Sequence, residues 1–306
     1  MLHSFEENSR FSHFCLIFCI LHLFSISVLV NYYTAKVRLF LLLSRKKENF
    51  FIFFFPKPVF PIFVASMLEP LWGQDSIIMI TNRILYEDNH LIVVNKLPSE
   101  IVQADKTGDV CLLDEVKQYI KEKYDKPGNV FAGLVHRIDR PVSGAVVFAK
   151  TSKALSRMTV KVKDRDFRKT YLALVKNHPP KQADMLEDFI VKNEKLNKSF
   201  VVPEGTKEAK LARMSYRVVG KSENFYLLEI ELFTGRHHQI RCQLAQIGCP
   251  IRGDLKYGYP RSNPDASISL HAYRIAFEHP VLKTQLEITA PLPEVAPWTA
   301  FKQLSD

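Results

Sequence analysis

The pattern of apolar and polar residues over positions 79–306 predicts a domain built mainly of β-strands. Two apolar runs flank the polar stretch Glu87–His90 within residues 83–96, which favours a hairpin. The continuous apolar runs at 129–135 and 144–150 are typical of buried strands. The same reasoning predicts further strands at 169–176, 212–221, 225–233, 267–280 and 284–293.

Three segments instead repeat their apolar residues at helical spacing, namely 109–124, 151–163 and 237–248. Asp109 is a candidate N-cap of the first helix, and Thr151 or Ser152 of the second, because short polar side chains satisfy free N–H groups. Gly248 is a good C-terminal stop for the third helix. Helices and strands do not alternate regularly, so the sequence predicts an α+β domain with several short helices.

Residues 1–78 differ in composition from the rest of the chain. They hold 13 of the 22 Phe residues but only one of the 11 Gly residues. The apolar stretch 15–30 covers about 16 residues, whereas a membrane-spanning helix needs about 20. Three prolines would interrupt a helix over 50–65. A membrane anchor is one interpretation; a secretory signal is another, although a short cationic start and a small-residue cleavage site are both missing.

The interpretation we favour is that residues 1–78 are a translated upstream region and not part of the native protein. Met79 is then the natural start, and residues 79–306 form one folded domain. This division predicts that every segment whose residues could take part in binding or catalysis lies after Met79.

The charge balance adds a class of partner. The chain has 42 Lys and Arg against 32 Asp and Glu, a net charge of +10, which favours a polyanion such as nucleic acid or an anionic membrane. Its five cysteines are scattered, lack the spacing of a zinc site and are odd in number. We therefore expect a reducing compartment and buried or inert thiols at Cys15, Cys19, Cys111, Cys242 and Cys249.

The stretch "GLVHRIDRPVSG" places one carboxylate, Asp139, between Arg137 and Arg140 in a loop that follows a buried strand. Loops on a rigid scaffold often carry catalytic groups, and nearby cations favour an ionised carboxylate. An ionised Asp can act as a nucleophile or stabilise positive charge at a sugar carbon. A structural ion cluster explains the same residues, and this segment alone leaves both interpretations open.

A second cluster lies in "TGRHHQIRCQLAQIGCPIRGD", where Gly235 permits a sharp turn into the predicted helix. Arg241 lies near the start of that helix and could pair with Asp139 through two hydrogen bonds, although a solvated basic face is the alternative. His237 and His238 are adjacent and cannot share one helix face, so we expect no metal site here.

Two further features have a structural and a functional interpretation. Tyr171, in "RKTYLALVK", is either a core residue with a satisfied hydroxyl or a residue that moves a proton near a catalytic carboxylate. The cations on and after the helix predicted over 151–163 form either a solvated face or a set of phosphate contacts. They are Lys153, Arg157, Lys161, Lys163 and Arg165.

Taken together, these segments resemble the RluA family of pseudouridine synthases. "HRIDRPVSG" is similar to the family's His-Arg-Leu-Asp signature, with Ile138 in place of Leu, and "KTYLALV" resembles its tyrosine strand. "TGRHHQIRCQLAQIGCPIRGDLKYG" resembles its third motif, with His237 where Thr is common and Arg252 where a small apolar residue is usual. "LHAYRIAFEHP" matches its C-terminal strand, so the resemblance covers roughly residues 81–300 in the right order.

The resemblance implies a mixed, mainly antiparallel sheet with flanking helices and a central cleft for RNA, formed by residues 79–306. It implies that Asp139 is the catalytic carboxylate, Tyr171 helps to abstract a proton, and Arg241 is the ion-pair partner of Asp139. The candidate substrate-binding residues are His136, Arg137, Arg140, Arg236, His238 and Gln239, with Arg137 expected to meet the RNA where a base is extruded.

The implied reaction is the isomerisation of uridine in a structured tRNA or rRNA to pseudouridine, which needs no cofactor and no metal. Asp139 would attack C1′ or assist the loss of a sugar proton, and both routes stay open. A cytoplasmic monomer without a membrane partner is expected. The alternatives are an enzyme that cleaves the glycosidic bond and releases the base, a non-catalytic RNA-binding module, and a membrane-anchored protein if residues 1–78 are native.

Overall fold

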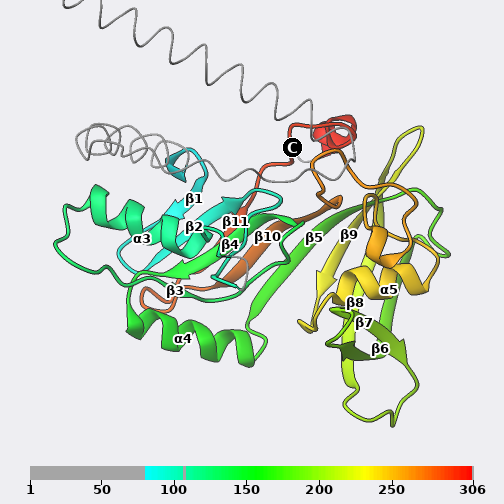
Figure 1. Cartoon of the computed structure of the whole chain (residues 1–306), viewed down its shortest axis with the longest axis horizontal. Coiled ribbons are helices and arrows are strands. Elements are labelled where there is room, and N and C mark those ends of the chain that lie inside the picture. The colour runs from blue at the N-terminus through cyan, green and yellow to red at the C-terminus, as the bar shows by residue number, and fades with distance from the viewer. Residues whose placement is uncertain (1–79, 106–107, 305–306) are drawn as a thin grey trace, which may run out of the picture. The chain divides into compact units, whose positions relative to one another are not determined.

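The computed structural model describes residues 80–105 and 108–304 (Figure 1). The expectations for residues 1–78, including Met79 as the start, lie outside the described residues. Cys15 and Cys19 lie outside them too, whereas Cys111, Cys242 and Cys249 are free and buried as predicted. Within the described ranges, no helix combines the length and the apolar character needed to cross a membrane.

One sheet of eleven strands forms the framework of the described part (Figure 1). Nine strands follow the order β1-β2-β4-β10-β5-β9-β8-β6-β7, while β3 pairs with β4 and β11 with β10. Among the described strands, β4 and β10 run parallel and all other pairs are antiparallel. The expected mixed, mainly antiparallel α+β architecture is confirmed.

The strands have the following bounds: β1 Ile84–Glu87, β2 Leu91–Lys96, β3 Gly133–Leu134, β4 Ser143–Ala149, β5 Phe167–Val175, β6 Ala183–Asn193, β7 Lys198–Val202, β8 Lys210–Lys221, β9 Tyr226–Leu232, β10 Leu270–Glu278 and β11 Gln285–Thr289. The helices are α3 Leu112–Lys123, α4 Ser152–Lys163 and α5 Gln239–Gln246, with 3₁₀ turns η1 Leu255–Tyr257 and η2 Trp298–Leu304.

Most predicted elements are confirmed, and two details are wrong. The N-cap position of α3 is Cys111 and not Asp109. The strand predicted over 129–135 is only the two-residue β3, because the chain pairs with β4 only at Gly133 and Leu134. The cap of α4 is Thr151, whose side chain accepts a hydrogen bond from the backbone N–H of Ala154 at 3.2 Å.

The hairpin of β6 and β7 was not predicted from the sequence. These strands pair with each other and β6 also pairs with β8, which extends the sheet beyond the predicted strands. In β6 only Leu186 and Ile190 are buried, so the apolar signal of this strand is weak.

The parallel contact between β4 and β10 requires glycine at one position. Gly144 pairs with Ala272 and has φ +115°, and a Cβ built there would lie 2.3 Å from the carbonyl oxygen of Ala272. Any larger residue would push the two strands apart. Since β4 directly follows the loop that carries Asp139, this close contact also fixes where that loop ends.

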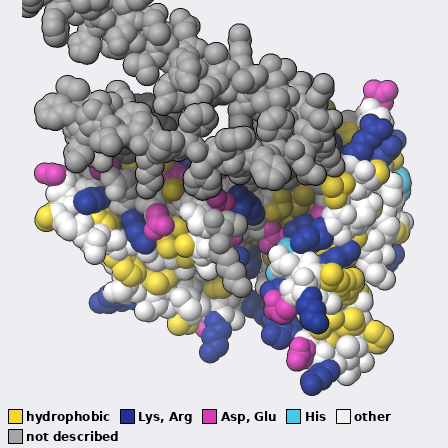
Figure 2. Space-filling model, in the orientation of Figure 1, with side chains coloured by type: hydrophobic (Ala, Val, Ile, Leu, Met, Phe, Trp, Pro, Cys, Tyr) yellow, Lys and Arg dark blue, Asp and Glu magenta, His cyan; other side chains and the backbone are white. Residues whose placement is uncertain are grey.

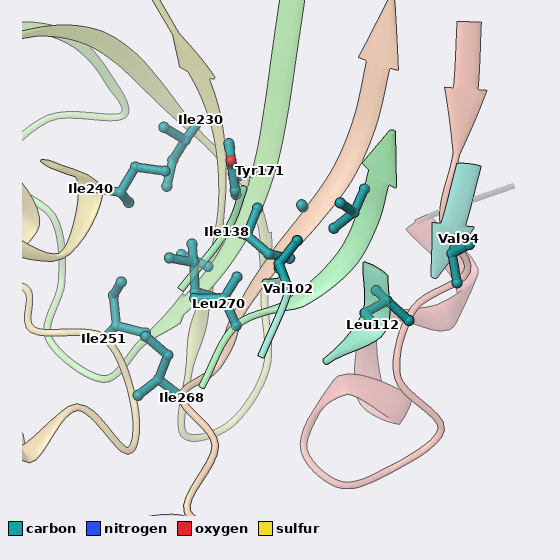
Figure 3. Packing of buried hydrophobic residues seen from close by; sticks show 14 of the residues in the cluster. Val94, Val102, Leu112, Ile138, Tyr171, Ile230, Ile240, Ile251, Ile268 and Leu270 are labelled. Carbon is teal, nitrogen blue, oxygen red and sulfur yellow. The ribbon is translucent and has the colours of Figure 1, made fainter. Parts of the chain in front are cut away.

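The largest hydrophobic core joins the sheet to the predicted catalytic segments (Figure 3). Ile138, one residue before Asp139, is buried in this core with Tyr171 from β5 and Ile230 from β9. Figure 3 shows these three side chains next to one another. Packing of Ile138 therefore anchors the loop and sets the position of the following carboxylate.

Candidate active site

A cleft of about 870 Å³ lies over the middle of the sheet and brings the predicted motifs together. The loop before β4, the end of α4, the start of β5 and the segment from β9 into α5 all line it. Asp139, Tyr171 and Arg241 are among its lining residues, although 102 positions separate the first from the last.

The walls of the cleft are strongly cationic. One side, from the end of α4 to β5, is lined by Lys163, Arg165, Arg168 and Lys169. The other side is lined by Arg213 and Arg236, and the cleft is also lined by Arg137 and Arg241. Asp139 and Glu231 are the acidic lining residues. Figure 2 shows Lys and Arg side chains gathered between the α4 side and the β6–β8 side of the sheet. This charge suits a polyanionic ligand.

Asp139 is paired with Arg241 and not with its neighbours in sequence. The Nη1 of Arg241 donates a hydrogen bond to Oδ2 of Asp139 at 3.1 Å. Arg140, in contrast, forms an ion pair with Asp109 and donates a second hydrogen bond to the carbonyl of Ser99. In the described part of the chain, no ion pair joins Arg137 to Asp139. The positive charge that balances Asp139 thus comes from Arg241 on α5, which is distant in the sequence.

Arg241 is itself fixed by a second carboxylate. Its Nε and Nη2 donate to the two oxygens of Asp254 at 2.7 and 2.9 Å. The side chains of Arg241 and Asp254 are 6% and 1% exposed, whereas that of Asp139 is 32% exposed. Burial alone lowers the pKa of Arg241, but the hydrogen bonds and charges of Asp254 and Asp139 raise it above its ordinary value. A permanently charged guanidinium therefore holds Asp139 at the edge of the cleft.

Lys96 fixes the turn that follows Asp139. This lysine is fully buried at the end of β2 and donates to the carbonyls of Leu97, Arg140 and Val142 at 2.8, 3.0 and 2.7 Å. Those three acceptors use all the donors of an ammonium group. The backbone N–H of Val142 also donates to the carbonyl of Asp139 at 3.0 Å. The loop that carries Asp139 is therefore held by one buried lysine.

Tyr171 and Lys169 lie two residues apart on β5, so they share the face of the strand that lines the cleft. Burial and then the charge of Asp139 raise the pKa of Tyr171, which favours its neutral phenol. Lys169 is half-buried, and burial lowers its pKa. Among the described residues, Lys169 has no hydrogen-bond or ion-pair partner. Its Nζ lies near Gly235, where an added Cβ would be 3.5 Å away.

His136 and Arg137 begin the loop in different ways. The Nε2 of His136 accepts from the backbone N–H of Val147 at 3.3 Å, and its ring packs on Phe167 with centroids 5.0 Å apart. Burial and then the charge of Lys169 lower its pKa to about 3, so the ring is neutral. Arg137 is exposed and lines the cleft. His136 thus supports the loop, while Arg137 is available to a ligand.

Gln239, at the start of α5, joins the segment that enters this helix to β8. Its Oε1 accepts from Thr234 and from the backbone N–H of Arg236, and its Nε2 donates to the carbonyl of Arg213. Gln239 is 3% exposed, so its amide already has partners inside the protein. Arg236 lines the cleft and donates through Nε to the carbonyl of Leu211 at 2.9 Å.

The structure brings some of the other predicted contacts to the cleft and not others. His238 lines it, whereas Arg140 is exposed and lies outside the lining residues. Of the cations on and after α4, Lys163 and Arg165 line the cleft. Arg157 instead donates to the carbonyl of Pro280, and Lys161 pairs with Asp166 and Glu278. These contacts favour a structural role for Arg157 and Lys161.

Sequence reasoning missed four residues of the site: Lys96, Lys169, Asp254 and Tyr257. Asp254 and Tyr257 lie inside the third motif, so their position after α5 was visible, but nothing in the pattern showed that the chain folds back onto Arg241. Lys96 ends an apolar run, and lysine is usually exposed, so the sequence carries no signal of its burial. Its buried position follows from the tertiary fold alone.

Comparisons with known proteins add evidence about the family. A family model described as RNA pseudouridylate synthase matches residues 90–246. The chain is 32% identical over 222 residues to the ribosomal large subunit pseudouridine synthase D of Zymomonas mobilis, covering 69% of each protein. It is 34% identical over 220 residues to the ribosomal large subunit pseudouridine synthase C of Buchnera aphidicola, covering 69% of this chain and 67% of that protein.

The fold is also similar to that of a solved human protein, RNA pseudouridylate synthase domain containing 4. The TM-score is 0.62 at 23% sequence identity, over 77% of this chain and 96% of that one. This similarity supports the fold assignment.

Proposed function

Because the chain belongs to the RNA pseudouridylate synthase family, and is thus an RNA-modifying isomerase, we propose that its central cleft isomerises a uridine with Asp139 as the catalytic carboxylate. The observation that carries this assignment is the pairing of Asp139 with Arg241 inside a cleft lined by cations. The pairing holds the carboxylate in place, and the partial exposure of Asp139 leaves it accessible to a bound nucleotide.

The reaction needs a carboxylate at the sugar. The bond between N1 and C1′ breaks, the uracil turns, C5 bonds to C1′, and the proton on C5 leaves while N1 gains one. Breaking the first bond places positive character on C1′, which an ionised Asp139 stabilises. Asp139 either attacks C1′ directly or assists loss of the proton on C2′, and both routes use the same carboxylate.

Tyr171 is our candidate for handling the C5 proton. Its ring lies in the core beside Ile138 and the residue lines the cleft, so its hydroxyl is fixed relative to the loop of Asp139. The raised pKa keeps Tyr171 a neutral phenol, which is a weak base, so it acts as a relay that gives its own proton to solvent as it accepts the proton from C5.

The cationic walls provide the binding energy for the RNA. A target base has to leave its stack, which costs a few kcal/mol. Phosphate contacts from the cleft walls, for example Lys163, Arg165 and Arg236, offset this cost. Arg137 is exposed in the loop of Asp139 and is our candidate for the space that the extruded base leaves.

We propose ribosomal RNA of the large subunit as the substrate, because the two curated relatives described above are named for that RNA. Transfer RNA is the competing substrate. A substrate of this kind also favours a monomer acting in the cytoplasm, which light scattering and cell fractionation would test.

The decisive experiment incubates wild type and Asp139→Asn with unmodified ribosomal RNA and with unmodified tRNA, digests each to nucleosides and quantifies pseudouridine and free uracil. We expect pseudouridine from the wild type on ribosomal RNA only. Asp139→Asn keeps its fold and its RNA affinity but makes no product. Asp125→Asn, on an exposed turn, is the matched control and keeps full activity.

The other outcomes separate the alternatives. Free uracil without pseudouridine would indicate cleavage of the glycosidic bond. Pseudouridine at the wild-type rate from Asp139→Asn would remove Asp139 from the mechanism. RNA binding without either product, on both RNAs, would favour a non-catalytic binding module.

A further inference from the structure

A chain of polar contacts reaches Asp139 from the β6–β7 hairpin. The backbone N–H of Ser199, on β7, donates to the hydroxyl oxygen of Tyr257 at 2.9 Å. The same hydroxyl lies 3.0 Å from Nδ1 of His238. On its other side, Nε2 of His238 lies 3.5 Å from Oδ2 of Asp139. Four residues from four separate segments thus form one continuous path.

One donor in this path is fixed by its chemistry, and the other follows from what each nitrogen of His238 faces. A backbone N–H only donates, so the oxygen of Tyr257 is the acceptor for Ser199. The hydroxyl proton of Tyr257 is then free to be donated to Nδ1 of His238. Burial raises the pKa of Tyr257 to about 12, so this proton is retained at neutral pH. Nε2 faces the carboxylate of Asp139, which only accepts, so the arrangement that gives this carboxylate a donor is the one in which Nδ1 accepts the proton of Tyr257.

The protonation of His238 follows from its surroundings. Its side chain is 7% exposed, and burial and then the charge of Arg241 lower its pKa to about 2. The ring is neutral and carries one proton. Since Nδ1 accepts, that proton is on Nε2, the nitrogen that faces Asp139.

His238 is also held in a strained backbone conformation. It occupies the N-cap position of α5 with φ 52° and ψ 27°, in the left-handed region. Non-glycine residues rarely adopt this conformation, and they do so at sites where the surroundings over-determine them. Here the ring of His237 stacks on that of His238, with centroids 3.8 Å apart, and Tyr257 binds its Nδ1.

We propose that His238 is a positioning residue whose Nε2–H orients Oδ2 of Asp139, and that the hydroxyl of Tyr257 fixes the tautomer that makes this possible. Arg241 donates to the same Oδ2. Oδ1 makes no hydrogen bond or ion pair with any described residue, so it is the oxygen presented to the sugar. This inference rests on the proposed role of Asp139 in the reaction and adds a geometric reason why one oxygen reacts.

The test measures the tautomer directly in the full-length protein labelled with ¹⁵N-histidine. Nitrogen chemical shifts distinguish Nε2–H, Nδ1–H and doubly protonated rings, and the signal lost in His238→Asn assigns this residue. The charged and titratable groups around the ring are Asp139, Tyr257, Arg241, His237, Lys256 and Lys192. We expect a neutral Nε2–H ring whose shifts stay constant from pH 8 to pH 5.5.

Tyr257→Phe keeps the aromatic ring but removes the donor to Nδ1. We expect this variant to show mixed tautomers at His238 and a kcat lowered about 10-fold, with KM for RNA unchanged. The matched control is Tyr259→Phe, two residues further along the same segment, which keeps both the wild-type spectrum and the wild-type kcat. An Nδ1–H or doubly protonated His238 in the wild type would overturn the proposal, as would equal kcat values for the two Phe variants.

A second pair of variants covers the case in which Tyr257→Phe fails to fold. Asparagine tolerates the left-handed backbone and retains an N–H donor, whereas alanine has no donor. We expect His238→Asn to keep kcat within about 10-fold of the wild type and His238→Ala to lose about 100-fold, a range typical of one hydrogen bond to a charged group. Equal losses in both would contradict the proposal. Full activity in Asp139→Asn would instead refute the proposed function, and the spectra would still report the tautomer.

Discussion

Arg241 Nη1 lies 3.1 Å from Asp139 Oδ2, and the rest of the same guanidinium forms a two-point contact with the buried Asp254. One side chain on α5 therefore contacts two carboxylates from two loops. Asp254 fixes the plane of the guanidinium, and that plane determines where Asp139 finds its partner. The position of the Asp139 carboxylate therefore depends on Arg241 and Asp254, which both lie outside the loop of Asp139.

Replacement of Arg241 by lysine tests this arrangement. A single ammonium cannot bind Asp254 through two atoms and reach Asp139 as well. We expect Arg241→Lys to lose about 100-fold in kcat and about 3 kcal/mol in the free energy of unfolding, because Asp254 stays buried with a poorer partner. Arg217→Lys, whose exposed side chain pairs with Glu229, is the control for the chemical change. Steady-state kinetics and urea unfolding would measure both effects, and a variant with wild-type kcat would contradict the arrangement.

Tyr171→Phe tests the proton relay. The ring stays in the core and only the hydroxyl is lost, so we expect folding and RNA affinity to be retained while turnover falls by a factor of about 10² to 10⁴. Substrate RNA with deuterium at C5 of uridine reports the step affected. The isotope effect should be larger in the variant than in the wild type, because loss of the C5 proton becomes limiting. Tyr273→Phe, buried on the neighbouring β10, is the control. Normal turnover in Tyr171→Phe would exclude the relay.

The fold could be predicted from sequence where apolar runs are long and bounded by turns. β4, β5 and β10 each bury a run of apolar residues, and β8 and β9 bury apolar residues that partly alternate with exposed ones, so their pattern and their structure agree. The β6–β7 hairpin was missed because most of its side chains are partly or fully exposed. Its pairing with β8 is a long-range contact that no local pattern records.

The site was predictable to the level of its segments and of one contact, that between Arg241 and Asp139, but not of the contacts around this pair. The loop of Asp139 suggested that Arg137 and Arg140 would balance the carboxylate, since they are its neighbours. The turn after Ile138 directs Arg140 to Asp109, and a helix 102 positions away provides the partner. Lys96 shows the same limit, because a buried ammonium is acceptable only where three carbonyls from other segments meet.

Lys169→Met tests the free ammonium in the cleft. A half-buried cation without a partner among the described residues suits a phosphate of the RNA, and its loss should weaken binding. We expect KM for RNA to rise about 10-fold, and the slope of log affinity against log salt to become smaller by about one. Lys169→Arg should restore most of the affinity. Lys153→Met, on the exposed start of α4, should change neither quantity. An unchanged salt slope in Lys169→Met would show that this ammonium binds no phosphate.

The fragment 79–306 tests the division of the chain. All three motifs, every described strand and the complete cleft lie within it. We expect the purified fragment to make pseudouridine with the kcat and KM of the full chain. A fragment that folds, as judged by its circular dichroism, but is inactive beside an active full-length chain would show that residues before Met79 contribute to the site.

Acid should destabilise the fold through its buried histidines. Burial lowers the pKa of His271 to about 4 and that of His136 to about 3, whereas an unfolded histidine titrates near 6.5. Between pH 6.5 and pH 4 the unfolded chain therefore binds protons that the native protein does not, so stability falls as pH falls. Each such histidine lowers the free energy of unfolding by up to about 1.4 kcal/mol per pH unit in this range.

His271 is the clearest case for measurement, because it is 1% exposed and its Nδ1 lies 2.8 Å from the hydroxyl of Ser143. Urea unfolding at pH 7 and pH 5 would give the loss for the wild type and for His271→Gln, whose amide does not titrate. We expect the loss to be smaller in the variant by about 2 kcal/mol, whatever its stability at pH 7. His178→Gln, at an exposed position, should lose as much as the wild type. Equal losses in wild type and His271→Gln would show that His271 accepts its proton without unfolding.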